Sequence, residues 1–229
     1  MGLAATTAYY TRAYATNSAG TAYGSEVSFT TSGTETGNTF TDIDGNVYHT
    51  VTIGTQVWMK ENLKTSHYRN GDSIPTGLSD AAWGATTSGA VYASKNTSYD
   101  FYNWYAVTDP RNVCPKGWHI PTDEEWTTLT TFLGGESVAG SKMKEIGSTH
   151  WQYPNTDATN SSGFTALPGG LRQYDGTFDP TGGMEGYWWS SSEGNANDAW
   201  SRTLYATVGA VNRLDGSKME GLSVRCIKD

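Results

Sequence analysis

The last quarter of the chain brings aromatic side chains together with amide, carboxylate and guanidinium groups. Trp188, Trp189 and Trp200 offer flat apolar faces, and several polar side chains follow within 30 residues. Aromatic faces stack on sugar rings while polar groups fix hydroxyls, so this mixture is typical of a surface that binds a glycan or a protein. Because neighbouring side chains of an extended segment point to opposite faces, we expect Trp188 to be buried and Trp189 to be exposed.

The histidines are not arranged for catalysis. His49, His67, His119 and His150 lie far apart, and no His-x-His, His-Glu-x-x-His or Gly-x-Ser-x-Gly pattern is present. His119 is better explained as a structural residue with hydrogen-bond partners than as a general base. We therefore expect the protein not to be an enzyme.

The oxygen-bearing side chains do not have the spacing of a compact calcium loop, in which nearly every second residue is a ligand. Asp157, Asn160 or Asp198 could hold a structural calcium ion, whereas no cysteine and histidine cluster suggests zinc. We expect no cofactor and no metal at the binding surface.

The acidic composition excludes whole classes of partner. The formal net charge is -8 and charged residues make up only 17% of the chain. No run of Lys or Arg supplies the positive surface that nucleic acid requires, so nucleic acid is not an expected partner. No window approaches the roughly 18 apolar residues of a membrane-spanning helix, so we expect no insertion into a membrane.

The chain has two cysteines, Cys114 and Cys226. Two distant cysteines in a Trp-rich, Lys-poor domain suit a single disulfide in an oxidising compartment. Two buried free thiols are the alternative.

Few helices are expected, because Gly, Ser, Thr and Asn are plentiful and interrupt most segments. The clearest helix follows Pro121, where Thr122 and Glu125 have the spacing of a capping box and Gly134-Gly135 ends the element. Its inward face is predicted to carry Trp126, Leu129, Phe132 and Leu133. A second helix is predicted over about 137–146, with Ala139, Met143 and Ile146 inward.

Alternating patterns predict strands on both sides of these helices. Residues 47–53 and 56–59 read as a hairpin that turns at Gly54-Thr55, and 101–105 reads as an aromatic strand. The segment 66–98 reads as a long ordered loop. Further strands are predicted at 187–191, 200–206, 208–212 and 222–227. The order of strands, helices and strands indicates an α+β fold.

Several blocks of the main domain resemble, in order, the Fibrobacter succinogenes major paralogous domain, which is common in Bacteroidetes surface proteins. The first block is TIGTQVWMKENL at 52–63, and the later ones are CPKGWHIPT at 114–122, NSSGF at 160–164, LPGGLR at 167–172, YWWSSS at 187–192 and SVRC at 223–226. Together they cover about residues 40–229, which is far more specific than one short motif.

This resemblance implies a C-type-lectin-like fold, with two short helices, mainly antiparallel strands and long ordered loops on one face. It would bring the last strand toward the Cys114 segment, so the resemblance implies a Cys114–Cys226 disulfide. Formylglycine-generating relatives depend on a pair of late redox-active cysteines. Only Cys226 occupies such a place, so the resemblance does not imply that activity.

The final 40 residues also resemble the variable region of target proteins of diversity-generating retroelements. The fixed positions would be Trp188, Ser190, Ser191, Trp200, Val211, Gly221, Val224, Arg225 and Cys226. The same residues would equally serve an ordinary lectin-like loop. Together with Trp189, the positions that would vary form the candidate ligand-binding set: Asn195, Asn197, Asp198, Arg202, Tyr205, Thr207, Asn212, Leu214, Asp215 and Ser217.

The first 31 residues read as a β-hairpin, with strands at 8–15 and 23–31 around an Asn-Ser-Ala-Gly turn. They resemble the last two strands of a fibronectin type III module, with Leu3, Thr7 and Tyr9 at its tyrosine corner and Ala5 in place of proline. Residues 32–39 form a polar linker.

These observations predict a secreted or outer-surface domain, such as part of a lipoprotein, whose export signal lies outside this sequence. We expect the 188–220 surface, supported by the 66–98 loop, to bind a protein or glycan on a cell or phage surface. The alternative is a structural module of a multidomain surface protein with no ligand of its own.

Overall fold

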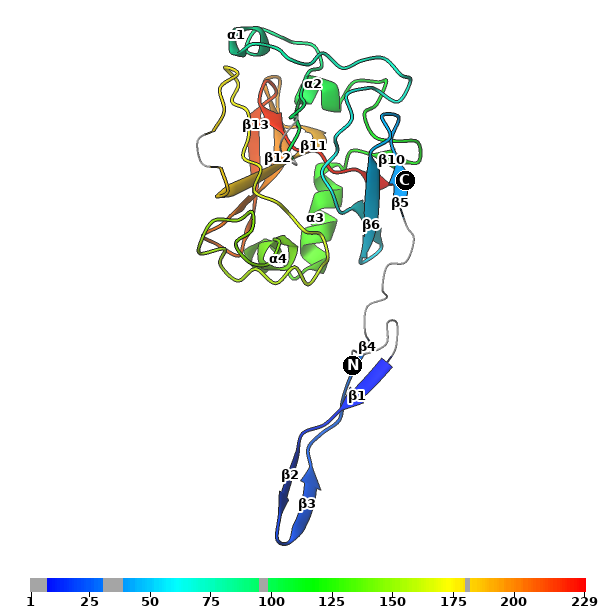
Figure 1. Ribbon diagram of the computed structural model, residues 1–229, viewed down its shortest axis with the longest axis vertical. Coiled ribbons are helices and arrows are strands. Elements are labelled where there is room, and N and C mark those ends of the chain that lie inside the picture. The colour runs from blue at the N-terminus through cyan, green and yellow to red at the C-terminus, as the bar shows by residue number, and fades with distance from the viewer. Residues whose placement is uncertain (1–7, 31–38, 95–98, 180–181) are drawn as a thin grey trace. The chain divides into compact units, whose positions relative to one another are not determined.

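The computed structural model describes residues 8–30, 39–94, 99–179 and 182–229. The chain divides into two compact units, residues 1–38 and 39–229 (Figure 1). In the part that the structure describes, no helix is long and apolar enough to cross a membrane.

The first unit is an antiparallel hairpin whose strands are each interrupted once. The outer pair is β1 (Ala8–Thr11) with β4 (Val27–Thr30), and the inner pair is β2 (Tyr14–Asn17) with β3 (Gly20–Tyr23). The predicted hairpin and its turn are therefore confirmed. Tyr10, Tyr14 and Tyr23 are exposed, so the described part of this unit forms no core of its own. Leu3, Ala5 and Thr7 of the expected tyrosine corner lie outside the described residues.

The second unit contains a five-stranded sheet that joins both ends of the domain. Its order is β10 (Trp118–His119), β15 (Ile227–Lys228), β7 (Gln56–Met59), β6 (Val47–Ile53) and β5 (Thr39–Thr41). The predicted hairpin of 47–53 and 56–59 is confirmed. It turns at Gly54, whose φ of 63° suits a residue without a side chain. The last strand, β15, thus pairs with β7 of this hairpin.

The remaining described strands of this unit form two further antiparallel sheets. One consists of β11 (Glu185–Glu193), β12 (Asp198–Tyr205) and β13 (Val211–Ser217), with β12 in the middle. The other consists of β8 (Val91–Tyr92), β9 (Phe101–Asn103) and β14 (Gly221–Leu222). The strand predicted at 208–212 was placed too early, because the turn after β12 extends to Ala210. The strand predicted at 222–227 is divided between β14 and β15.

The described helices are α1 (Asp80–Trp83), α2 (Trp104–Val107), α3 (Asp123–Phe132) and α4 (Glu136–Met143), and with the antiparallel sheets they make the fold α+β. The expectation of two short helices missed α1 and α2. The aromatic strand ends at Asn103, because the Asn103 side chain accepts the Ala106 N–H at 3.0 Å and caps α2. The segment expected to be loop likewise contains α1 and β8.

Helix α3 begins with the predicted capping box. The Thr122 hydroxyl accepts the Glu125 N–H at 3.2 Å, and the Glu125 carboxylate accepts the Thr122 N–H at 2.8 Å. Trp126, Leu129 and Leu133 are buried as expected. The prediction that Phe132 faces inward is wrong, because its ring lies exposed over the β6–β7 turn. Ile146 is exposed too, because α4 ends before it.

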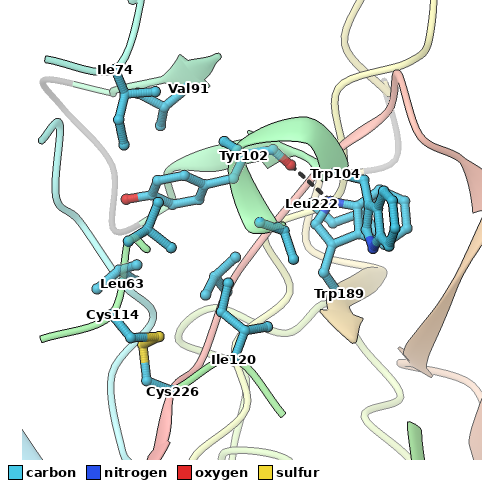
Figure 2. Close-up of a cluster of buried hydrophobic side chains, with 14 of the residues drawn as sticks. Leu63, Ile74, Val91, Tyr102, Trp104, Cys114, Ile120, Trp189, Leu222 and Cys226 are labelled. Atoms are coloured by element: carbon cyan, nitrogen blue, oxygen red, sulfur yellow. Dashed lines mark hydrogen bonds between the residues drawn. A yellow bond between two sulfur atoms is a disulfide. The ribbon is translucent and has the colours of Figure 1, made fainter. Parts of the chain in front are cut away.

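The core consists of two clusters that lie on opposite faces of β11. Trp188 belongs to one cluster with Trp58 and Trp126, and Trp189 belongs to the other with Trp104. Figure 2 shows Trp189 beside Trp104, with its indole N–H donating to the Tyr102 carbonyl at 2.8 Å. The prediction that Trp189 is exposed is therefore wrong, because both faces of this strand are covered.

A disulfide links Cys114 to Cys226, as the resemblance implied (Figure 2). Both cysteines are buried in the cluster that contains Trp189 and Trp104. The bridge closes a loop with a sequence separation of 112 residues, and it fixes the segment before α3 to the residue that precedes the last strand.

His119 holds the C-terminal residue and the start of α3 together, in keeping with the structural role expected for it. Its Nδ1 lies 2.7 Å from Asp229 Oδ1, and its Nε2 lies 2.9 Å from Glu125 Oε1. Both nitrogens donate only when the imidazole is protonated. Burial lowers the pKa of His119, but the two carboxylates raise it more, so the pKa lies above its ordinary value.

Removal of the disulfide should destabilise the domain strongly. Closing so long a loop lowers the entropy of the unfolded chain, so the Cys114→Ser/Cys226→Ser variant should lose about 2–5 kcal/mol of unfolding free energy. Tryptophan fluorescence during guanidinium unfolding measures this loss. Reductant should shift the parent toward the variant and leave the variant unchanged. A variant as stable as the oxidised parent would contradict the prediction.

His119→Gln should remove a pH-dependent part of the stability. Because the folded pKa is raised, the contribution of His119 is complete below its unfolded pKa of about 6.5 and declines as pH rises through the folded pKa. The difference between parent and variant in urea unfolding should therefore be larger at about pH 5.5 than at about pH 8.5. His150→Gln is the control, since in the described part of the chain the His150 ring is hydrogen-bonded to one carboxylate, that of Glu145. Equal pH profiles for the two variants would refute the idea.

Candidate functional site

Ten of the eleven candidate residues lie along β12, β13, the loop that precedes β12 and the turn between the two strands, and Trp189 lies on β11. Asp198 pairs with Ser217 at one end of this ribbon, and Leu204 pairs with Val211 at the other. At about 3.3 Å per residue the eight residues of β12 span about 25 Å. The candidates therefore line a long ridge instead of converging on one pocket.

The loop from Gly194 to Asn197 is fixed by its own polar groups. The Asn195 amide oxygen accepts the N–H groups of Asn197 and Asp198, at 2.8 and 3.0 Å, and its NH₂ donates to Asp198 Oδ2 at 2.9 Å. Lys218 is buried beneath the loop and donates to the Ala196 carbonyl at 2.8 Å. Asn195 and Asn197 are thus exposed side chains on a preorganised turn.

The middle of the ridge is the outer strand β13. Directly paired residues share one face of a sheet, so Leu214 lies in a row with Ser201 and Trp189, and Asn212 lies in a row with Thr203. In both rows the β13 side chain is more exposed than its partner on β12. Leu214 is 42% exposed. It is the apolar side chain in the middle of this otherwise polar ridge.

The far end of the ridge carries two tyrosines around one carboxylate. The Tyr187 hydroxyl donates to Glu185, which lies directly opposite Tyr205. Burial, followed by the charge of Glu185, raises the pKa of Tyr205 above its ordinary value. Both phenols therefore remain neutral hydrogen-bond donors at physiological pH.

A buried lysine fixes the turn beyond Tyr205. The Lys144 ammonium donates to the carbonyls of Thr156, Tyr205 and Val208 at 2.9, 3.1 and 2.8 Å. Burial lowers the pKa of Lys144 to about 8. This contact holds the backbone on either side of the exposed Thr207.

The opposite face of the ribbon is held against α3 by one carboxylate shared between two arginines. Asp123 lies 2.6 Å from Nη1 of the buried Arg202 and 2.9 Å from Nη2 of Arg213. The Arg213 guanidinium stacks on Trp200, 3.3 Å from the ring centre. Burial alone would raise the pKa of Asp123, but the hydrogen bonds from the two arginines hold it below its ordinary value.

Nine of the eleven candidate residues are at least partly exposed, and two are not. Trp189 lies in the core, and Arg202 is 1% exposed because it pairs with Asp123 beneath the sheet. Arg202, expected at the ligand surface, is therefore a structural residue. The exposed or half-exposed candidates are Asn195, Asn197, Asp198, Tyr205, Thr207, Asn212, Leu214, Asp215 and Ser217.

Arg213 was missed from the sequence, although it is an exposed side chain in the middle of β13. Its position between Asn212 and Leu214 was the available signal. Because neighbouring side chains of a strand alternate, Arg213 lies on the other face of β13 from Asn212 and Leu214, beside Asp123.

The expected calcium ligands do not come together. Asp198 begins β12, whereas the Thr156 N–H beside Asp157 bonds the Ala206 carbonyl just beyond the other end of that strand. Asn160 uses its amide on Thr165. Among the described residues, no group of three or more His, Cys, Asp or Glu side chains is arranged to hold a metal.

A pocket of about 310 Å³ lies apart from the ridge. Its walls come from the segment after β7, from the residue two positions after α4 and from the loop at 165–167. The lining residues are Lys60, Glu61, Asn62, Lys64, Glu145, Thr165 and Leu167. The sequence predicted no site here.

Comparison with known protein families gives one match, which covers most of the chain. The family model described as the Fibrobacter succinogenes major domain matches residues 51–228. No curated protein and no solved structure matches the chain. The matched region contains the ridge, the pocket and both cysteines.

Asp123→Asn should destabilise the sheet that carries the ridge. The change leaves the buried guanidinium of Arg202 without its charged partner, which should cost about 3 kcal/mol of unfolding free energy. Glu124→Gln is the matched control, because Glu124 shares the first turn of α3 but is exposed and makes no described ion pair. Urea unfolding measures both variants. Equal losses would mean that only the charge at the helix start matters.

Proposed function

The chain belongs to the Fibrobacter succinogenes major domain family, and we propose that it is a binding domain whose ridge on β12 and β13 recognises a protein or glycan. The observation that carries this proposal is the exposure of nine candidate side chains along a supported ribbon, of which Tyr205, Asn212 and Leu214 lie on the face opposite α3. Asp123 of α3 and Lys144, which directly follows α4, supply that support. A preorganised surface binds without a large entropy cost.

The mixture of groups suits a macromolecular ligand. The ridge combines Tyr205 and Leu214 with amide and carboxylate side chains, and its length of about 25 Å fits an extended partner better than a single sugar ring. The ligand is proposed to lie on a cell or phage surface, and the protein to be secreted or attached to the outer cell surface as a lipoprotein.

The finer assignment of the fold, C-type-lectin-like, is part of this proposal. It is supported by the pairing of the C-terminal β15 with β7 and by the long segments between short strands. We assign no catalytic role, because the exposed candidates include no nucleophile paired with a base.

We further propose that the ridge is diversified by a retroelement. This proposal is supported by a difference in burial between the positions expected to be fixed and those expected to vary. Seven of the nine positions expected to be fixed are buried, whereas nine of the ten expected to vary are at least partly exposed. The exception among the varying positions is Arg202. A reverse transcriptase gene and a template repeat beside this gene would test the idea.

Replacing Tyr205, Asn212 and Leu214 with Ala should abolish ligand capture and leave folding intact. These side chains are exposed or half-exposed, so each change should cost little stability, within about 0.5 kcal/mol. Loss of two anchors and a hydrogen-bonding group should weaken binding at least tenfold. Capture is measured on a glycan array and by pull-down from cell lysate, and folding by thermal unfolding.

Tyr174→Ala is the matched control, because Tyr174 is an exposed tyrosine on a loop outside the ridge. Its variant should capture ligand like the parent. No capture by the parent, or unchanged capture by the triple variant, would favour the alternative that the domain is a structural module of a larger surface protein.

A further inference from the structure

The pocket lined by the segment after β7 contains lysine side chains that form no ion pair among the described residues. Lys60 is half-buried and Lys64 is exposed, and both line the pocket. Neither ammonium group makes an ion pair or a side-chain hydrogen bond among the described residues, although Lys64 attracts the buried Asp100 at longer range. Two ammonium groups at one pocket therefore remain available to an anion.

A third positive charge lies directly behind the pocket. Arg225 is fully buried, and its guanidinium donates to Asn62 Oδ1 at 2.9 Å and to the Thr165 carbonyl at 2.9 Å. Asn62 and Thr165 are themselves lining residues. The described residues place no carboxylate within ion-pair distance of Arg225, so its charge is balanced only from further away, by Glu61.

The two carboxylates of the pocket are already partly occupied. Both oxygens of Glu61 accept hydrogen bonds from His49, at 2.7 Å from its N–H and 2.8 Å from Nδ1. One oxygen of Glu145 lies 2.8 Å from His150 Nδ1. The lone pairs that remain suit neutral donors such as hydroxyl groups better than a second full cation.

The charges at the pocket do not cancel. Lys60, Lys64 and Arg225 supply three positive charges against two negative charges from Glu61 and Glu145, which leaves one positive charge. A volume of about 310 Å³ is at the lower end of the range for small-ligand sites. The complementary ligand is therefore small, singly negative and rich in hydroxyl groups.

We propose that this pocket binds a uronic acid, with the sugar carboxylate at Lys60 and Lys64 and its hydroxyls toward Glu145. Leu167 supplies the apolar part of the wall. The site is separate from the ridge, since no ridge residue lines it. The sugar could be free or the end of an oligosaccharide, because both present the same carboxylate and hydroxyls.

Isothermal titration of the full chain with D-glucuronate should show saturable binding. Lys60→Gln/Lys64→Gln should weaken it at least tenfold, because two charge-assisted contacts are lost. Lys116→Gln is the control, as Lys116 is an exposed lysine outside this pocket. D-glucose should bind at least tenfold more weakly than glucuronate. A glucuronate-ended tetrasaccharide that binds more tightly than the free acid would identify the chain end as the source, and the reverse would identify the free sugar.

Absence of saturable glucuronate binding would overturn the proposal. So would equal weakening by the Lys116 variant, which would indicate attraction by overall charge, and equal binding of acetate or glycine, which would indicate that the hydroxyls contribute nothing. The ridge variant with Ala at 205, 212 and 214 should bind glucuronate like the parent, so this result is independent of the function proposed for the ridge.

Discussion

The buried amide of Asn62 is the interaction on which the domain depends most. Its oxygen accepts both the Trp188 indole N–H and the Arg225 Nε–H at 2.9 Å, and its NH₂ donates to the Ser223 hydroxyl at 3.1 Å. Trp188 belongs to β11, and Ser223 and Arg225 belong to the segment between β14 and β15. Asn62 follows the hairpin of β6 and β7. Because an unpaired buried polar group is costly, the three segments must meet in this one arrangement.

That requirement explains why the segment between β14 and β15 is wholly buried. Ser223 bonds β11 through the Trp189 N–H at 3.1 Å, and the Val224 carbonyl accepts the Leu63 N–H at 2.8 Å. Cys226 is bonded to Cys114 and accepts the Met59 N–H at 3.1 Å. A short piece of backbone thus joins two sheets without being a regular strand for most of its length. The two core clusters can then lie on opposite faces of β11.

The features that the sequence predicted correctly are those set by neighbouring residues. The capping box of α3 needs only Thr122 and Glu125, and the hairpin of β6 and β7 needs an alternating pattern around Gly54. The errors come from distant contacts. The strand pattern correctly indicated that Trp188 and Trp189 face opposite ways, but it could not indicate that α2 covers the second face. Arg202 likewise looked like a surface cation because Asp123, its partner, lies 79 residues away.

These contacts also determine which positions can change while the fold is kept. Asp123, Lys144 and Lys218 hold the ribbon from outside the exposed ridge, so side chains such as Leu214 and Thr207 do not contribute much to the packing that supports them. Surface substitutions of this kind usually alter stability by less than about 0.5 kcal/mol. A diversified ridge would therefore gain new specificity at little cost in folding, and Arg202 would be the one candidate position where variation is penalised. Fewer positions are therefore expected to vary than the sequence alone indicates, because the Arg202 side chain is buried against Asp123 of α3.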